Sequence, residues 1–150
     1  MSAEATLDLV VIGSALVEIT PAELGRPLAE VEKLVPLPSG SAANFAAVLA
    51  GLGVEVGFIS RVGADELGRW LITRLAERGI HTDFIRMVEG QMTPVSFCWM
   101  DQEGEKTFYF YRFPGFCDPM ATLRERDLDP AQVTAGRLFD FTEATIRHEP

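Results

Sequence analysis

The chain has 150 residues, 47% of them hydrophobic, which is enough to bury the core of one domain. Acidic residues outnumber basic ones by 22 to 13, and the formal net charge is −9. Because phosphate backbones are bound by clustered Lys and Arg, this balance argues against nucleic acid as a partner. Cys98 and Cys117 have neither CxxC spacing nor a neighbouring His, so the sequence predicts no metal site and no disulfide.

No membrane partner is expected either. The first residues lack the positive n-region and long apolar h-region of a signal peptide. The apolar stretch 45–54 is too short to span a bilayer. We therefore expect a cytoplasmic protein.

The first part of the chain alternates between strand and helix patterns. Residues 7–12 form an almost unbroken apolar run that predicts a buried parallel strand. Residues 14–38 contain four prolines and predict irregular or edge-strand structure. The following elements are a helix over 42–52, which is apolar nearly all round and so should be buried on most sides, a strand over 54–60, a helix capped by Asp65 and ending near 78, and a strand over 84–88. This alternation is typical of an α/β domain with a parallel sheet.

The pattern changes after residue 93. Two β-rich runs, 94–100 and 106–112, flank a glycine-containing turn and predict a hairpin. A hairpin inserted in an α/β chain indicates a separate small sheet or flap. Residues 113–129 are loop-like, a short helix begins at Asp129–Pro130, and a strand is predicted over 138–142.

Three polar side chains are candidates for ligand binding. Asn44 is the strongly polar residue of an otherwise apolar helix; it either bonds backbone near the helix start or faces a cleft and binds a polar ligand. Arg112 shares one strand face with Phe108 and Phe110; it either clamps a carboxylate or hydroxyls, or extends into solvent from a strand end. Glu18 follows the first strand; it either accepts two sugar hydroxyls or is a solvated loop carboxylate.

Several motifs resemble the ribokinase-like (PfkB) carbohydrate kinases. Residues 39–46, Ser-Gly-Ser-Ala-Ala-Asn-Phe-Ala, resemble the N-terminal signature of that family. Residues 60–68 contain its VGxDxxG stretch, and residues 79–82 are similar to its GVxT turn. Residues 110–112, Phe-Tyr-Arg, resemble a motif of fructokinases, 2-keto-3-deoxygluconate kinases and 5-dehydro-2-deoxygluconate kinases.

The resemblance implies a three-layer α/β/α sandwich with a small β lid, formed here by residues 14–38 and 92–112. It implies that Gly40 and Asn44 contact sugar hydroxyls, and that Arg112 meets the keto or carboxylate end of the sugar with Phe110 beside it. Glu18 occupies the place of the family's first-strand acid, usually Asp. The sequence departs from the family at Glu18 and at Ser39, which replaces the first glycine of a Gly-Gly pair.

The resemblance also implies ATP and Mg²⁺ as cofactors. The family's catalytic base lies in a Gly-x-Gly-Asp motif, which residues 1–150 do not contain. We therefore expect the N-terminal part of a kinase domain, with the C-terminal ATP-binding part absent, no catalytic residue and no metal ligand. Such a chain would be inactive alone.

The hypothesis from the sequence is a sugar kinase that phosphorylates a hydroxymethyl group of a ketose or a keto-deoxy sugar acid. One alternative is a non-catalytic sugar-binding or dimerisation module, with a homodimer formed through the β lid. Another is a nucleoside kinase of the same fold, which Arg112 suits less well.

Overall fold

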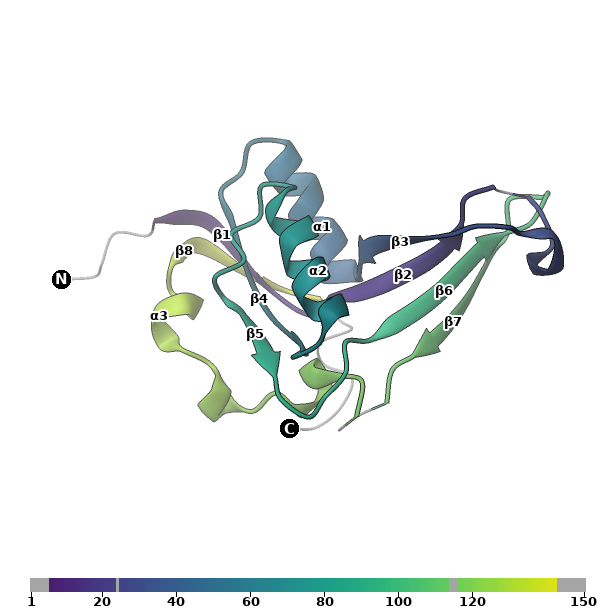
Figure 1. Cartoon of the computed structure of the whole chain (residues 1–150). Helices are drawn as coiled ribbons and strands as arrows, with labels where there is room; N and C mark the ends of the chain where they lie inside the picture. Colours follow the sequence, from purple (N-terminus) through teal and green to yellow (C-terminus); the bar gives the residue numbers. More distant parts are fainter. Residues whose placement is uncertain (1–5, 24, 114–115, 143–150) are drawn as a thin grey trace.

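The computed structural model describes residues 6–23, 25–113 and 116–142, and its strands form two separate sheets (Figure 1). The elements are β1 (Leu7–Ile12), β2 (Leu16–Pro21), the 3-10 turn η1 (Leu28–Glu30), β3 (Leu34–Ser39), α1 (Ser41–Gly51), β4 (Val56–Gly63), α2 (Glu66–Ala76), β5 (Ile85–Val88), β6 (Val95–Met100), β7 (Lys106–Tyr111), the 3-10 turns η2 (Pro119–Thr122) and η3 (Glu125–Asp127), α3 (Pro130–Val133) and β8 (Gly136–Phe141). The strand orders are β5-β4-β1-β8 and β3-β2-β6-β7.

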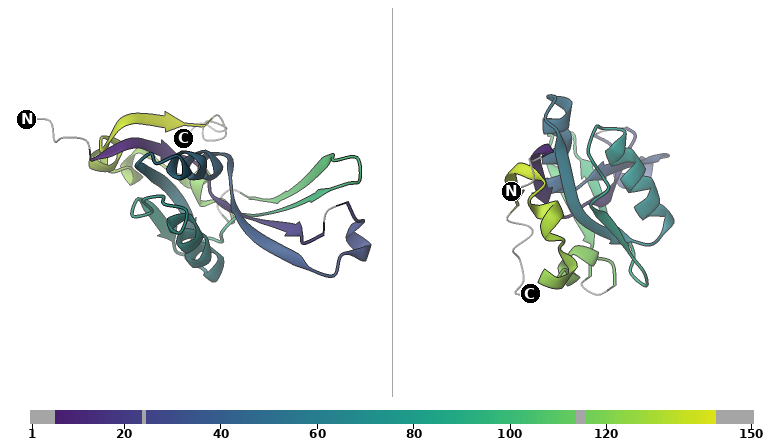
Figure 2. Two further views of the ribbon diagram at one scale, coloured as in Figure 1. Left: turned by 90° about the horizontal axis from the view of Figure 1, so that it is seen from above. Right: turned by 90° about the vertical axis from the view of Figure 1, so that its left-hand side faces the viewer.

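The first sheet is parallel and is covered on both faces. Leu9 and Val11 of β1 join one core with α1 and α2, whereas Val10 and Ile12 join a second core with Met120 of η2 (Figure 2). This alternation explains why the sequence of β1 is apolar throughout rather than at every second residue. The predicted buried parallel strand and the α/β class are confirmed.

Helix α1 is less buried than its sequence predicts. Ala42, Ala43 and Ala46 are fully buried against the sheet, but Phe45 and Val48 are 41% and 63% exposed. The prediction of a helix buried on most sides was wrong because α1 packs on the sheet along one face, formed by these alanines with Leu49 partly buried beside them. The small alanines allow close approach, whereas Phe45 and Val48 lie outside this face.

The second sheet extends away from the α/β body, and we call it the projecting sheet (Figure 1). Antiparallel pairs β2–β3 and β6–β7 each run over six residues, but β2 and β6 pair, in parallel, only over Val17–Ile19. In the left view of Figure 2 the two hairpins accordingly separate beyond this pairing, and at the tip the Gly25 amide donates to the Met100 carbonyl at 3.1 Å. The prediction of irregular or edge structure over 14–38 holds for β3, which carries Pro36 and Pro38 at the outer edge. It is wrong for β2, a central strand.

Asp65 connects helix α2 to the base of the projecting sheet. Its carboxylate caps α2 by accepting from the Gly68 amide at 2.8 Å, and it also accepts from the Thr93 amide and hydroxyl, each at 2.7 Å. Thr93 and Pro94 lead directly into β6. Gly63 completes the junction, because a Cβ there would overlap the Thr93 backbone. The VGxDxxG stretch therefore fixes the origin of β6.

The pKa of the Asp65 carboxyl lies below its ordinary value. Partial burial raises it, but the hydrogen bonds from Thr93 and Gly68 and the nearby charge of Arg69 together outweigh burial.

Within the described part of the chain, no helix is long and apolar enough to cross a membrane.

We predict that Asp65→Ala lowers the free energy of unfolding at neutral pH by about 1–3 kcal/mol, because it removes a helix cap and leaves the Thr93 donors unpaired. A carboxyl with a lowered folded-state pKa stabilises the fold above its unfolded-state pKa of about 4, and this contribution is lost as the pH falls further. In urea denaturation, the difference in unfolding free energy between wild type and Asp65→Ala should therefore become smaller below about pH 4.

Glu66→Ala is the matched control. Glu66 is the neighbouring acid, its side chain is 89% exposed, and it pairs with Arg69 on the same helix. Its removal should leave the unfolding free energy nearly unchanged. A difference between wild type and Asp65→Ala that stays constant from pH 7 down to acid would contradict the role given to this carboxylate.

Candidate functional site

The link between β1 and β2 lies against the start of α1. Gly40 precedes α1 with a φ of 117°, a backbone conformation that only glycine adopts without strain. A Cβ at Gly40 would also overlap the carbonyl oxygen of Ser14 and lie 3.2 Å from the Cα of Ala15. Glycine is thus required twice, by its dihedral angles and by the close approach of the Ser14 backbone.

Asn44, Ser39 and Glu18 form a hydrogen-bonded series beside this junction. The Asn44 Nδ2 donates to Ser39 Oγ at 3.4 Å, and Ser39 Oγ donates to Glu18 Oε2 at 3.3 Å. Asn44 is exposed and lines an open hollow with Ala47, Val48 and Arg78. Among the described residues the Asn44 amide is therefore neither buried nor bonded to backbone, and Glu18 lies within β2 rather than in a loop.

Arg112 is held from two sides just beyond the end of β7. Its Nε donates to Asp118 Oδ2 at 3.0 Å and its Nη2 donates to Ser14 Oγ at 3.0 Å. The Arg112 side chain is only 17% exposed, so the alternative of an arginine extended into solvent is wrong. Phe110 stacks on Phe108 with 5.9 Å between ring centroids, which confirms that the two share one face of β7.

All five predicted residues lie around the Ser14–Gly40 contact. Arg112 bonds Ser14, whose carbonyl faces Gly40, and Ser39 next to Gly40 bonds both Glu18 and Asn44. Phe110 belongs to the same surface, because the strand registers place Glu18 beside Ser96 and Ser96 beside Phe110. The structure thus brings together one carboxylate, one amide and one guanidinium, groups suited to a ligand rich in hydroxyls.

Three residues of this region have no counterpart in the sequence-based predictions. Ser14 directly follows the strand-ending Gly13, a position where α/β sheets gather ligands, and that signal was available. Asp118 precedes Pro119, a pattern that indicates only a turn. The third, Arg61, gave no sequence signal.

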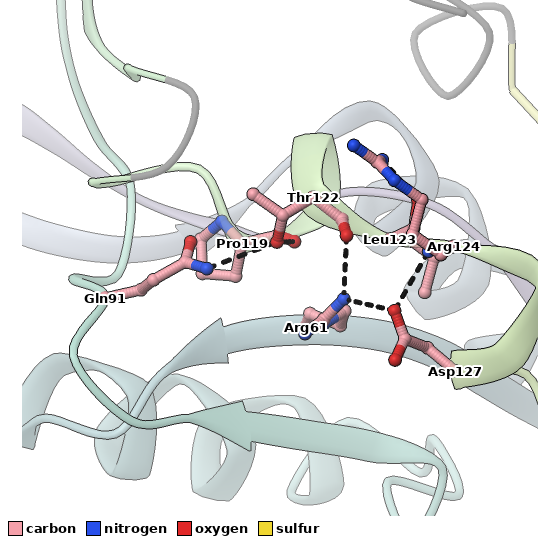
Figure 3. A network of polar contacts seen from close by, with 7 residues as sticks. All are labelled: Arg61, Gln91, Pro119, Thr122, Leu123, Arg124 and Asp127. Atoms are coloured by element: carbon pink, nitrogen blue, oxygen red, sulfur yellow. Dashed lines mark hydrogen bonds and ion pairs between the residues drawn. The ribbon is translucent and has the colours of Figure 1, made fainter. Parts of the chain in front are cut away.

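Arg61 anchors the η2 turn that follows Asp118. Its Nη1 donates to the Thr122 carbonyl at 3.2 Å and to Asp127 Oδ2 at 2.9 Å (Figure 3). Gln91 reinforces the turn by donating to Thr122 Oγ1 at 3.2 Å. These contacts run from β4 and from the segment after β5 to the chain that carries Asp118, and so fix where that carboxylate lies.

The described residues do not fit a resident Mg²⁺ ion. Over residues 6–23, 25–113 and 116–142, no group of three His, Cys, Asp or Glu side chains could hold a metal ion. Cys98 is a free thiol, and burial, together with the charge of Glu18, raises its pKa, so it is poorly suited to act as a nucleophile.

Comparison with known proteins identifies the family. The family model described as pfkB family carbohydrate kinase matches residues 6–121. The chain belongs to the pfkB family of carbohydrate kinases. A fructokinase of Solanum tuberosum is 30% identical over 142 residues, which cover 95% of this chain and 44% of the relative. The chain spans 36–44% of the length of the curated relatives it matches.

Solved structures of the ribokinase fold confirm the fold class. A sugar kinase of Pyrococcus horikoshii superposes with a TM-score of 0.79 at 25% identity, covering 95% of this chain and 47% of that one. An Escherichia coli protein solved in complex with ATP and Mg²⁺ gives 0.79 at 27% identity, covering 95% and 44%. This chain therefore has the α/β architecture of the N-terminal portion of these kinases.

We predict that Gly40→Ala destabilises the protein by about 2–4 kcal/mol, because the new methyl group displaces Ser14 and the backbone is strained. Gly53→Ala is the control: φ is 87° there, but nothing lies within 4 Å of the added Cβ. It should cost only the strain, about 1 kcal/mol. Equal losses of unfolding free energy in chemical denaturation would refute the importance of the close approach.

Proposed function

We propose that this chain supplies the sugar-binding part of an ATP-dependent sugar kinase, which transfers the γ-phosphoryl group to a hydroxymethyl group of a ketose or keto-deoxy sugar acid. The observation that carries the proposal is the arrangement of Glu18, Asn44 and Arg112 around the Ser14–Gly40 contact. Carboxylate, amide and guanidinium groups provide both donors and acceptors for sugar hydroxyls. The fructokinase name of the curated relatives supports a ketose.

In this proposal Gly40 and Asn44 contact sugar hydroxyls, Glu18 accepts from two of them, and Arg112 meets the keto or acid end with Phe110 beside it. The projecting sheet, residues 14–38 and 92–112, acts as the lid. Glu18, Ser96 and Phe110 are register partners across β2, β6 and β7, and Arg112 follows two residues after Phe110. Closure of the lid would cover the sugar and exclude water, which competes as phosphoryl acceptor.

ATP and Mg²⁺ are proposed as cofactors because a related structure contains both. They would supply the transferred phosphoryl group and neutralise its developing charge. No described residue of this chain is assigned to them, and we propose that residues 1–150 bind sugar but do not phosphorylate it alone. We also propose the cytoplasm, where ATP is available, as the compartment.

Two alternatives remain distinguishable from this proposal. A non-catalytic sugar-binding or dimerisation module would bind sugar or self-associate without ATP turnover in the full-length gene product. A nucleoside kinase would bind a nucleoside in place of a free sugar. Arg112, which is ion-paired with Asp118, and Glu18, which accepts from the Ser39 hydroxyl, favour a hydroxyl-rich ligand over a nucleobase.

We predict that fructose or another ketose raises the melting temperature of the full-length protein in a thermal-shift screen that also contains sugar acids and nucleosides. Asn44→Ala should weaken the binding of the stabilising sugar about tenfold, because the hydrogen bonds of the amide to hydroxyls are lost. Gln102→Ala removes an exposed amide at the turn of the β6–β7 hairpin and should leave binding unchanged. Absence of a shift with every ketose and sugar acid would defeat the proposal.

We propose further that the protein forms a homodimer through the projecting sheet. Strand β7 is exposed along its whole length, and Tyr109 and Tyr111 are each 54% exposed. Aromatic side chains exposed in a row are common at protein interfaces.

Sedimentation equilibrium of the full-length protein should then show a dimer. Tyr109→Glu should weaken it at least about tenfold, because a buried interface would receive an unpaired charge. Phe139→Glu changes a 44% exposed aromatic residue on β8 of the other sheet and should leave the dimer intact. A monomeric wild type, or equal effects of both substitutions, would rule out this interface.

A further inference from the structure

The guanidinium of Arg112 is already occupied on the side that faces the body of the protein. Its Nε and Nη2 both approach Asp118 Oδ2, at 3.0 and 2.9 Å, and Nη2 also donates to Ser14 Oγ. The two charged side chains are 17% and 11% exposed. A pair so little exposed is screened less by water and salt than a surface pair, so the negative charge of Asp118 offsets the positive charge of Arg112 more effectively.

Asp118 is also fixed in position. It immediately precedes η2, which Arg61 and Gln91 hold through Thr122. Its second oxygen, Oδ1, is buried and has no hydrogen-bond partner within residues 6–23, 25–113 and 116–142. The carboxylate therefore has Arg112 as its ionic partner in the described structure, and the anchored turn opposes its displacement.

The charge balance of the candidate site follows from these contacts. Arg112 contributes one positive charge, whereas Asp118 and Glu18 contribute one negative charge each. The formal sum over the three is −1. A ligand carboxylate would thus meet a cation that is already neutralised and a further anion at Glu18, whereas a neutral hydroxyl can still accept from, or donate to, these groups.

We infer that Asp118 is a specificity-determining residue, which acts through Arg112 to favour neutral ketoses over sugar acids. The inference rests on the proposed sugar-binding function and narrows its substrate class. Asp118 is a positioning residue in this scheme: it sets the orientation of the guanidinium and the net charge that a ligand meets. Ser14 shares only the first of these tasks, since its hydroxyl is uncharged.

The test compares the dissociation constants of fructose and 2-keto-3-deoxygluconate, measured by calorimetry on the full-length protein. The wild type should bind fructose more tightly. Asp118→Asn keeps the size of the side chain but removes its charge. The affinity for the sugar acid relative to that for fructose should therefore rise about tenfold or more. Asp118→Glu should restore the wild-type ratio, because it restores the charge.

Two controls separate charge from structure. Ser14→Ala removes the uncharged partner of Arg112 and should weaken both ligands alike, leaving their ratio unchanged. In an Arg112→Gln background, Asp118→Asn should move the ratio less than in the wild type, because the residue acts through the missing guanidinium. If Asp118→Asn does not fold, Asp118→Ser, with a smaller polar side chain, takes its place.

The outcomes distinguish the inference from the function beneath it. A ratio that stays at the wild-type value in the folded Asp118 variants, while fructose still binds, overturns the role of Asp118 alone. A wild type that prefers the sugar acid overturns it as well. A wild type that binds neither ligand, nor any other sugar in the thermal-shift screen, overturns the proposed function and this inference with it.

Discussion

The close approach of the Ser14 carbonyl to Gly40 is the constraint on which the rest of the site depends. It brings the link between β1 and β2 against the first turn of α1, and no residue with a Cβ fits there. Two sets of hydrogen bonds start beside this contact. Ser39 bonds both Glu18 and Asn44, and the Ser14 hydroxyl accepts from Arg112. Groups from α1, from β2 and from the end of β7 are thereby placed together, although they are far apart in the sequence.

The projecting sheet is held at its base by apolar packing and by short polar connections: Val17 is buried in the core that includes α1 and α2, and Ile19 and Val95 pack against that core. Asp65 fixes Thr93 where β6 begins, and Arg112 binds Ser14 where β2 begins. Beyond Ile19 the strands β2 and β6 no longer pair, although at the tip the Gly25 amide donates to the Met100 carbonyl at 3.1 Å and joins the two hairpins. A sheet that is anchored at its base and joined across its tip is suited to swing over a ligand as one unit without losing the contacts that define the site.

Much of the fold could be predicted because its signals are local. The apolar run of β1, the cap at Asp65 and the alternation along β7 each follow from the period of one element, and the structure confirms them. The exposure of α1 was not predictable in this way, since periodicity shows which residues are apolar but not how many layers cover them. The pairing of Arg112 with Asp118 depends on the path of an irregular loop, and the series from Asn44 to Glu18 depends on the pairing of β2 with β3 and on the turn from β3 into α1. Neither leaves a pattern in the sequence.

The prolines of β3 have a consequence for how the projecting sheet can grow. The Val17 amide donates to the Pro94 carbonyl, so the backbone N–H and C=O of Val17 point toward β6 and not toward β3. Pro38, the β3 residue opposite Val17, therefore points its backbone groups away from β2, and so does Pro36, two residues before it. The Pro38 carbonyl indeed accepts from Arg78 at 3.5 Å on that outer side. Because proline has no amide hydrogen, this margin offers acceptors without the matching donors, and a new strand cannot complete a ladder there. A strand from a second polypeptide can therefore extend this sheet only at its other edge strand, β7.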